Sequence, residues 1–283
     1  MWKQVEPLLR SRFPSLAVKL TTAAGDAERF AAEFARAHRA GQVIVVGGDG
    51  SIHEIVNGLV DAGYEGSLGI VPAGTGNDVA RNLGIANRPD SLDPSRARPI
   101  DLARVSLHDS SGGQRHRWFV NSLSVGASAR ANRIALAIGG LIRGPIKYPI
   151  AGVLALLSGG ADPYDVMVAG TRRFIGPAIN LTVANGACVG GGLRISPDSV
   201  PDDESLELVI IGALSRIGAL GALRSLRTGG HLAMRDVTVI AAGSAPIEIR
   251  GPGVLRLETD GENLVSHQCV IVNLEPGRLR VAR

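Results

Sequence analysis

Residues 43–58, with the sequence VIVVGGDGSIHEIVNG, constrain the fold of this chain more than any other stretch. They begin with β-branched residues that predict a buried strand, and apolar residues at the spacing of one helix face follow from position 52 onward. Glycine in the turn between them allows positive φ angles and close approach of a ligand. The stretch therefore predicts an open strand-to-helix turn that contains Gly47, Gly48 and Gly50.

Such a turn suits a phosphate group, because its open amides and the helix dipole favour negative charge. Asp49 lies inside it, where a lone carboxylate would repel a bare phosphate. We therefore predict that Asp49 helps to organise a Mg²⁺ ion beside the phosphates, and that Gly47, Gly48, Gly50 and Ser51 contact them. The alternative is an ordinary strand-to-helix turn in which Asp49 or Ser51 caps the helix.

A second turn of the same kind follows. Residues 67–71 are another short apolar run, and residues 72–78 lead into a short helix that ends at Gly84. Two such turns in succession lie side by side at the carboxyl edge of a parallel sheet, where open α/β sheets bind ligands. Helix capping by Asn77 or Asp78 is compatible with this role. The predicted second phosphate-binding loop consists of Gly74, Thr75, Gly76 and Asn77.

The two motifs, GGDGSIHEIVNG at 47–58 and PAGTGNDVARNLG at 72–84, resemble the catalytic region of the superfamily of diacylglycerol kinases, sphingosine kinases and bacterial lipid kinases. The phosphofructokinases and NAD kinases share only the GGDG turn with it, and the resemblance continues through most of the chain. It implies an ATP-dependent lipid kinase of phospholipid metabolism, which transfers the γ-phosphate of Mg·ATP to the hydroxyl of a lipid such as diacylglycerol.

The resemblance also implies a Rossmann-like, phosphofructokinase-like nucleotide-binding domain, which we assign to residues 1–98. From residue 100 onward, short alternating strands separated by turns are typical of an antiparallel β-sandwich. We assign residues 99–283 to this lipid-substrate domain, so the predicted fold class is α/β plus all-β. In the first domain we expect helices at 1–13 and 25–39, a strand at 16–20 and a linker at 85–100. The strands expected in the second domain cover 100–107, 117–125, 164–169, 178–185, 206–212, 236–241, 246–250, 254–259 and 268–274.

The start of the chain departs from the family pattern. Family members usually open with a strand ending in an Asn-Pro-x-Ser-Gly loop that contacts the nucleotide, and this sequence begins after the place where that loop falls. We therefore expect the first family strand to be missing, which leaves open a homologue that binds nucleotide or lipid without catalysis. The resemblance places Thr21 beside the nucleotide; its alternative role is that of a β-branched residue at a strand end.

The acids expected to carry the chemistry lie late in the chain. Residues 259–262, Thr-Asp-Gly-Glu, place two carboxylates on either side of a glycine, and taken alone they predict a hairpin turn of the Asp-Gly type. In lipid kinases that resemble this chain, the corresponding segment points into the cleft and carries the acceptor of the hydroxyl proton. This resemblance implies that Asp260 or Glu262 is the acceptor, and it does not decide between them.

A third acidic segment, residues 195–208, is similar to a family loop that holds a structural Mg²⁺ ion. Matching it implies Asp203 as the side-chain ligand, and Val200 and Ser205 as carbonyl ligands. Two residues differ from the family pattern, because Glu204 replaces the usual glycine and Glu207 the usual aspartate. A solvated acidic turn is the alternative.

Two further segments bear on the lipid. Residues 134–157 form two apolar helical segments around a basic bend. They fit either a helical pair packed on the sandwich, or an acyl-chain entrance where Arg143 and Lys147 meet headgroups. Sphingosine kinases carry an aspartate that contacts the amine where this chain has Ser128 and Arg130, so a cationic sphingoid base is disfavoured.

Composition excludes several other classes. Of the 283 residues 45% are hydrophobic, which suits a folded protein. The net charge of +4 and the pI near 9.5 come from scattered arginines without interleaved aromatic residues. Nucleic-acid binding therefore has little support, and an anionic membrane surface is the more natural partner. The two cysteines, Cys188 and Cys269, are expected to be buried thiols in a reducing compartment.

No signal peptide is visible, and the longest uncharged run, residues 174–193, is interrupted by proline, asparagine and glycine. We therefore expect a cytoplasmic protein without a transmembrane segment that contacts the membrane peripherally. A NAD kinase-like enzyme is an alternative, which the Gly-Thr-Gly-Asn-Asp loop disfavours. The sequence leaves open whether the chain forms a homodimer.

Overall fold

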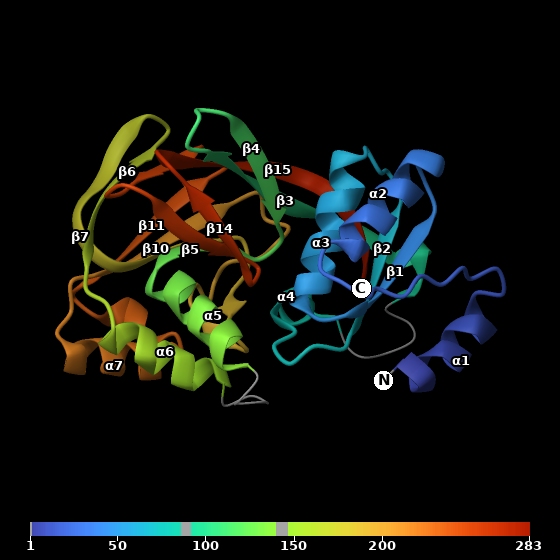
Figure 1. The fold of residues 1–283 in the computed structure, drawn as a ribbon, viewed down its shortest axis with the longest axis horizontal. Coiled ribbons are helices and arrows are strands. Elements are labelled where there is room, and N and C mark those ends of the chain that lie inside the picture. Colours follow the sequence, from blue (N-terminus) through green and yellow to red (C-terminus); the bar gives the residue numbers. More distant parts are fainter. Residues whose placement is uncertain (1, 86–91, 140–146) are drawn as a thin grey trace.

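The computed structural model describes residues 2–85, 92–139 and 147–283. An α/β half and a larger half built mainly from strands lie side by side (Figure 1). Two long strands, β3 (Ala97–His108) and β15 (Cys269–Ala282), pass from one half into the other, so 13 strands belong to one sheet. The halves are therefore joined by continuous backbone hydrogen bonding, and the C-terminus lies in the α/β half.

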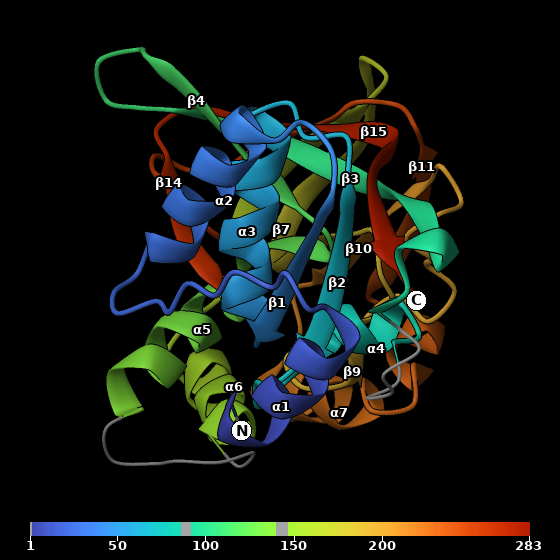
Figure 2. The same cartoon turned by 90° about the vertical axis from the view of Figure 1, so that its right-hand side faces the viewer.

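The α/β half contains the two predicted strand-to-helix units. Strands β1 (Gln42–Gly47) and β2 (Ser67–Pro72) pair in parallel along their full length. Helices α2 (Asp26–Ala37) and α3 (Asp49–Asp61) cover one face of these strands (Figure 2). The helices predicted at 1–13 and 25–39 are confirmed, and the half is completed by α1 (Trp2–Arg12) and the short α4 (Asp78–Asn82).

The strand predicted at 16–20 is wrong. These residues have no regular secondary structure, and β1 pairs only with β2 among the described strands. A cavity of about 260 Å³ separates residues 16–21 from β1. The backbone of this segment therefore does not pair with β1 as a neighbouring strand would. Leu16 instead packs in a small cluster with Leu9 of α1, whereas Leu20 is exposed.

The strand-rich half confirms most of the expected strands, with their limits shifted by a few residues. Nearly all of its neighbouring strands pair antiparallel. Besides β3 and β15 it contains β4 (Gln114–Phe119), β5 (Ser122–Gly126), β6 (Asp162–Val168), β7 (Thr171–Ala184), β10 (Leu206–Gly212), β11 (Val237–Gly243), β12 (Ile247–Arg250), β13 (Leu255–Thr259) and β14 (Glu262–Ser266), with the short pair β8 (Cys188–Val189) and β9 (Leu193–Arg194).

Two predictions of segment limits are wrong. The linker expected at 85–100 gives its last residues to β3, which begins at Ala97; residues 86–91 lie outside the described part of the chain. The single strand expected at 117–125 is split into β4 and β5. It breaks because the amides of Val120, Asn121 and Ser122 donate to the Asp260 carboxylate instead of to a neighbouring strand.

The strand expected at 268–274 continues to Ala282 as β15. Its second part pairs antiparallel with β3 and, at the very end, parallel with β2. This pairing brings Leu279 and Val281 into the core of the α/β half, next to Ile100 and Leu102 of β3. The core of the α/β half thus contains side chains from the N-terminal part of the chain and from its last strand. The domain boundary at 98 stays a prediction.

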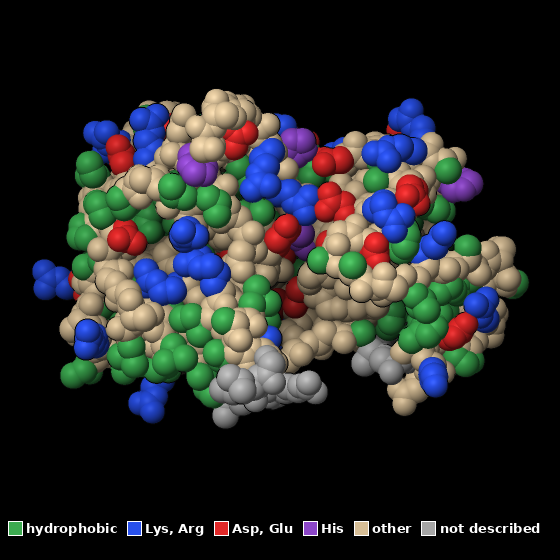
Figure 3. Space-filling view, viewed as in Figure 1, with side chains coloured by type: hydrophobic (Ala, Val, Ile, Leu, Met, Phe, Trp, Pro, Cys, Tyr) green, Lys and Arg blue, Asp and Glu red, His purple; other side chains and the backbone are tan. Residues whose placement is uncertain are grey.

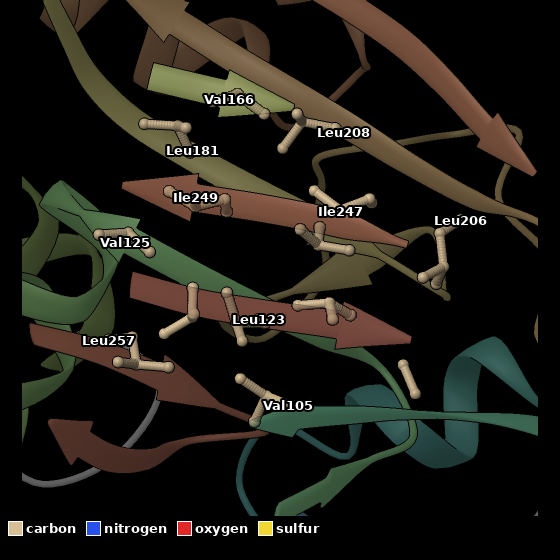
Figure 4. Packing of buried hydrophobic residues seen from close by; sticks show 14 of the residues in the cluster. Val105, Leu123, Val125, Val166, Leu181, Leu206, Leu208, Ile247, Ile249 and Leu257 are labelled. Atoms are coloured by element: carbon tan, nitrogen blue, oxygen red, sulfur yellow. The ribbon is translucent and has the colours of Figure 1, made fainter. Parts of the chain in front are cut away.

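The larger core lies inside the strand-rich half (Figure 4). Leu123 and Val125 alternate along β5 and point into the same interior as Leu181 and Leu257, as the two-residue period of a strand requires. All four side chains are almost fully buried. Each such burial contributes about 1.5–3 kcal/mol, so this core provides a rigid base for the turns at its edge.

Three helices pack below the strand-rich half in Figure 1: α5 (Ala127–Ile138), α6 (Lys147–Leu157) and α7 (Arg216–Ser225). The first two confirm the helical segments expected within 134–157, and the bend with Arg143 lies outside the described residues. Helix α7 was not predicted; its sequence signal is Ser215, whose side chain accepts from the amide of Gly218. No helix in the described ranges is long and apolar enough to cross a membrane. Cys188 is buried and Cys269 half-buried.

Candidate active site

The two glycine turns touch each other, backbone against backbone. Gly47 ends β1, Gly48 caps α3 and Asp49 is the first residue of that helix. A Cβ atom on Gly48 would lie 2.9 Å from the Cα of Gly74, and one on Gly74 would lie 2.5 Å from the Cα of Gly48. Only glycine fits at both positions, so the sequence pattern is a direct consequence of this contact.

The second turn is closed by its own side chain. Asn77 adopts a left-handed φ of 53°, its Oδ1 accepts from the Gly74 amide at 2.8 Å, and its Nδ2 donates to the Gly74 carbonyl at 2.9 Å. The amide of Ala73 donates to the carbonyl of Gly47 at 2.8 Å. Thr75 is exposed beside these residues. The turns are thus preformed and leave the loop from Gly74 to Gly76 open on one side.

A pair of carboxylates lies at this edge. Asp49 Oδ1 accepts from the amide of Val79 at 3.0 Å, and Asp78 Oδ2 accepts from the amide of Gly191 at 2.6 Å. Burial raises the pKa of Asp78, and the nearby charge of Asp49 raises it further, while Gly191 and Arg81 act in the opposite direction. Asp78 was treated in the sequence only as a helix cap; its pairing with Asp49 comes from the contact between the turns.

Two neighbouring carboxylates, of which one raises the pKa of the other, suit a divalent cation better than a bare anion. The described residues contain no group of three or more His, Cys, Asp and Glu side chains placed to hold a metal ion. A pair of carboxylates is a donor set that Mg²⁺ uses in proteins when phosphate oxygens and water complete its shell.

The remaining polar residues of the first motif hold neighbouring elements in place. Glu54 accepts from the amides of Gly25 and Ala27 at the start of α2, at 3.0 and 3.1 Å. Asn57 exchanges hydrogen bonds with the backbone of Trp118 in β4. Helix α3 is thus fixed to both halves of the molecule. Thr21 lies away from these contacts and lines the cavity of about 260 Å³ together with Ser51 and Ala73.

The acidic turn between β13 and β14 is held from several sides. The carboxylate of Asp260 accepts from the amides of Val120, Asn121 and Ser122 at 2.7, 3.0 and 3.1 Å. Its side chain is 0% exposed, and its backbone has a left-handed φ of 47°. From the other side, Asn132 of α5 donates to the carbonyl of Gly261 at 2.6 Å. Asp260 therefore serves as a buried anchor of the turn.

Glu262 differs from Asp260 in exposure and partners. Its side chain is 38% exposed; Oε2 lies 2.5 Å from Nε2 of His53 and 3.1 Å from an Nη of Arg117. Arg117 also pairs with Glu28 of α2 at 2.8 Å. This chain of charges crosses the seam between the halves, where Figure 3 shows acidic side chains with basic ones on both sides. His53 and Arg117 were not recognised in the sequence, because their partners are far away along the chain.

Glu258 was also missed by the sequence analysis. It is 9% exposed, and its carboxylate accepts from the amide of Gly261 at 3.0 Å. Burial raises its pKa to about 7, and the nearby charge of Asp260 acts in the same direction; the hydrogen bonds from Gly261 and Ser124 and the charge of His53 do not offset them. Only its position in a strand, two residues before Asp260, could have drawn attention to it.

The proposed structural metal loop lies away from the glycine turns. Asp203 Oδ1 accepts from the amide of Ser205 at 3.0 Å, and the Val200 carbonyl accepts from the amide of Asp202. Burial, together with nearby acids, raises the pKa of Asp203. Glu204 has a left-handed φ of 59°, which explains why glycine suits this position. The three ligands predicted here share one turn, and their metal stays a prediction.

The residues expected to disfavour a cationic substrate lie on α5. The Ser128 amide donates to Asn180 at 2.8 Å, and an Nη of Arg130 donates to the Ala155 carbonyl of α6 at 3.1 Å. Arg133 lies near Arg130 and the exposed Arg256, so that burial and these two charges lower its pKa. This side of the acidic turn is therefore basic.

Paired glycine turns lie at the carboxyl edge of parallel strands in an α/β unit, and an acidic turn of a β-sandwich-like unit contacts the helix that follows the first of them. This combination of units is the class to which the comparisons assign the chain. The diacylglycerol kinase catalytic domain model matches residues 1–105, and the YegS C-terminal NAD kinase beta sandwich-like domain model matches residues 121–283.

Relatives and solved structures agree with these matches. A protein of Xanthomonas oryzae pv. oryzae named "Probable lipid kinase YegS-like" is 34% identical, over 96% of this chain and 88% of its own length. One of the same name from Pseudomonas fluorescens is 31% identical, over 94% and 85%. A diacylglycerol kinase structure from Bacillus anthracis shares the fold, with a TM-score of 0.70 and 22% identity over 99% of this chain and 89% of that one. This chain belongs to the YegS-like lipid kinase family, within the diacylglycerol kinase superfamily.

Proposed function

We propose that this protein transfers the γ-phosphate of ATP to the hydroxyl group of a lipid such as diacylglycerol. The observation that carries the proposal is the proximity of two features: the paired glycine turns, and the acidic turn whose Glu262 contacts His53, one helical turn after Asp49 in α3. Phosphoryl transfer needs little more than positioned phosphates, a cation and an acceptor for the hydroxyl proton. Membership of the lipid kinase family supports a lipid as the acceptor.

The nucleotide binds at the edge of a Rossmann-like unit in this proposal. The amides of Gly47 to Ser51 and of Gly74 to Asn77 hold the phosphates. The largely apolar cavity beside Thr21 and Ser51 suits a flat heterocycle such as adenine. Asp49 and Asp78 hold Mg²⁺, which when bound neutralises charge on the phosphate oxygens.

The two acids of the late turn have different roles in the proposal. Asp260 is fully enclosed and already accepts three amide hydrogen bonds, so it fixes the shape of the turn. Glu262 is partly exposed and takes the proton of the lipid hydroxyl. Although burial acts to raise it, the hydrogen bonds and charges of His53 and Arg117 lower the pKa of Glu262 to about 2, which keeps this carboxylate ionised at neutral pH.

A membrane contact through α6 supplies the lipid. Among the described residues, those that line the exposed hollow on this helix are the apolar Pro149, Ile150, Val153 and Leu154. Tyr148 at the start of the same helix lies within electrostatic range of Asp49 and Asp78, so α6 leads from the surface towards the glycine turns. Peripheral binding to an anionic membrane is therefore a natural route for an acyl chain.

Vesicle sedimentation tests the membrane contact with two matched variants. Leu154 on α6 and Val239 on β11 are both 42% exposed, so Leu154→Ser and Val239→Ser remove similar apolar surface. We expect Leu154→Ser to weaken binding to vesicles that contain an anionic phospholipid about threefold or more, and Val239→Ser to bind like the wild type. Equal binding by all three proteins would refute the contact through α6.

Radiolabelled phosphate transfer tests the reaction itself. The protein is assayed with labelled ATP and Mg²⁺ against a panel of neutral lipids in mixed micelles, with NAD and a sphingoid base included. We expect transfer to a neutral lipid hydroxyl and none to the sphingoid base. Transfer to NAD alone would favour a NAD kinase, and ATP binding without transfer to any acceptor would favour a non-catalytic homologue.

A further inference from the structure

His53 is buried at the seam between the two halves, in contact with the acidic turn. Its side chain is 1% exposed; Nε2 lies 2.5 Å from Glu262 Oε2, and Nδ1 lies 3.6 Å from Asp260 Oδ2. The ring belongs to α3, whereas both carboxylates belong to the turn between β13 and β14. One imidazole therefore links the helix of the first motif to the acids of the last.

The other groups around the ring are few. On its own helix, Asn57 Nδ2 lies 3.3 Å from Nε2 of His53. From β13, the buried Glu258 is close enough for its pKa to respond to the charge of His53. From β4, Arg117 contacts the same Glu262 carboxylate and connects it to Glu28 of α2. Among the described groups, the charges facing His53 are thus mainly carboxylates, with Arg117 beyond them.

This surrounding determines the charge of the ring. Burial disfavours the imidazolium, but the hydrogen bond with Glu262 and the charges of Asp260 and Glu262 outweigh it and raise the pKa of His53 to about 9. The ring is therefore a cation at neutral pH. Its Nε2 donates to Glu262, whereas Nδ1 faces Asp260 Oδ2 at 3.6 Å and has no hydrogen-bond partner among the described residues. The Nε2 donor fixes the carboxylate of Glu262, and the charge of the ring holds it near the buried anchor Asp260.

We propose that His53 is a positioning residue, which fixes the Glu262 carboxylate relative to the phosphate-binding start of α3. The inference rests on the proposed function and adds a residue to its machinery. Asp49 and His53 are four residues apart in one helix and share a face. The phosphates bound by the amides at the start of α3 and the proton acceptor Glu262 are thus placed by a single rigid element, although Glu262 comes from the opposite half of the molecule.

Replacement of His53 has different effects on the rate if the residue is only structural and if it positions Glu262. If His53 only filled space, its replacement would lower stability and leave the rate of the remaining folded enzyme unchanged. If it positions Glu262, the loss of the charged imidazolium donor lets the carboxylate move towards Arg117, and the rate falls while ATP still binds. A displacement of about 1 Å at a reacting group can cost up to about 100-fold in rate.

Steady-state kinetics of His53→Gln between pH 6 and 10 tests this role. His116→Gln is the matched control, because His116 also pairs with an aspartate, Asp61 at 3.0 Å, but is 43% exposed and lies outside the site. We expect kcat of His53→Gln to fall at least about tenfold with KM for ATP unchanged, and the alkaline decline of the wild type to disappear. His116→Gln should behave like the wild type. Unchanged kcat and pH profile in His53→Gln would overturn the proposal.

A second measurement needs neither a variant nor an active enzyme. Titration of the wild type with isotope-labelled histidine, followed by NMR, reports the protonation of each ring directly. We expect His53 to lose its proton near pH 9, and a midpoint at or below 6.5 would overturn the proposal. A wild type that shows the raised midpoint and transfers phosphate to no acceptor would refute the proposed function while leaving the contact of His53 intact.

Discussion

Single residues in this site acquire their roles from distant parts of the chain. Asp260 and Glu262 were located from the sequence, but which of them accepts the proton was left open. The two acids differ in their surroundings: three amides at 120–122 enclose Asp260, while Glu262 stays partly exposed between His53 and Arg117. These partners are separated from the turn by well over one hundred residues, and no local pattern announces them.

Replacing Asp260 by asparagine tests its anchoring role. The Asp260 carboxylate accepts from the amides of Val120, Asn121 and Ser122 with both oxygens. An asparagine side chain replaces one of these oxygens by an NH₂ donor, so at least one buried amide loses its acceptor. We expect Asp260→Asn to lower the free energy of unfolding by about 3 kcal/mol, measured by urea denaturation, and to reduce turnover as the turn loosens. Wild-type stability together with full turnover would show that the carboxylate anchors nothing.

Secondary structure elements were predicted well where local pattern and tertiary contact agree. The strand-to-helix units at β1–α3 and β2–α4 could be read from glycine spacing, because the contact of Gly48 with Gly74 itself selects glycine. The split between β4 and β5 could not, since a carboxylate from residue 260 interrupts an otherwise continuous strand pattern. The supposed strand at 16–20 failed for the opposite reason: its pattern is apolar, but none of the described strands pairs with it.

Substitutions at Gly50 and Gly221 distinguish an effect on ATP binding from an effect on stability. A Cβ atom at Gly50 in α3 or at Gly221 in α7 would meet nothing within 4 Å. We therefore expect Gly50→Ala and Gly221→Ala both to preserve or raise stability, by up to about 1 kcal/mol. Only Gly50→Ala should weaken ATP binding, by about tenfold, because its methyl group occupies the approach of a phosphate. Calorimetric titration with ATP measures the difference, and equal affinity in both variants would place the phosphates elsewhere.

At the scale of the whole molecule, the two halves are joined by sheet pairing and by charge. The sequence indicated an α/β unit followed by a β-sandwich, which the structure shows in coarse outline. It did not indicate that β15 returns to pair with β2, because the pairing of the last residues depends on the finished sheet. The charged chain from Glu28 through Arg117 and Glu262 to His53 likewise exists only when the halves meet.

The stability of this junction depends on pH. The pKa of His53 is raised from 6.5 to about 9, so its contribution to the free energy of unfolding is complete below pH 6.5 and is lost as the pH rises through 9. The pKa of Glu258 is raised from 4.5 to about 7 by burial. Its contribution to the free energy of unfolding is therefore present below pH 4.5 and is lost as the pH rises through 7. Urea denaturation of the wild type and His53→Gln from pH 6 to 10 isolates the histidine. We expect the stability gap between the two to shrink across this range, and a constant gap would contradict the charged pairing.

Glu262 is proposed to accept the hydroxyl proton opposite the nucleotide phosphates. The most direct test is single-turnover transfer from labelled ATP to the accepted lipid by the wild type and Glu262→Gln, with ATP affinity measured in parallel. We expect Glu262→Gln to bind ATP with unchanged affinity and to transfer phosphate about 100-fold or more slowly than the wild type. Transfer at the wild-type rate by Glu262→Gln, with ATP bound normally, would contradict this role.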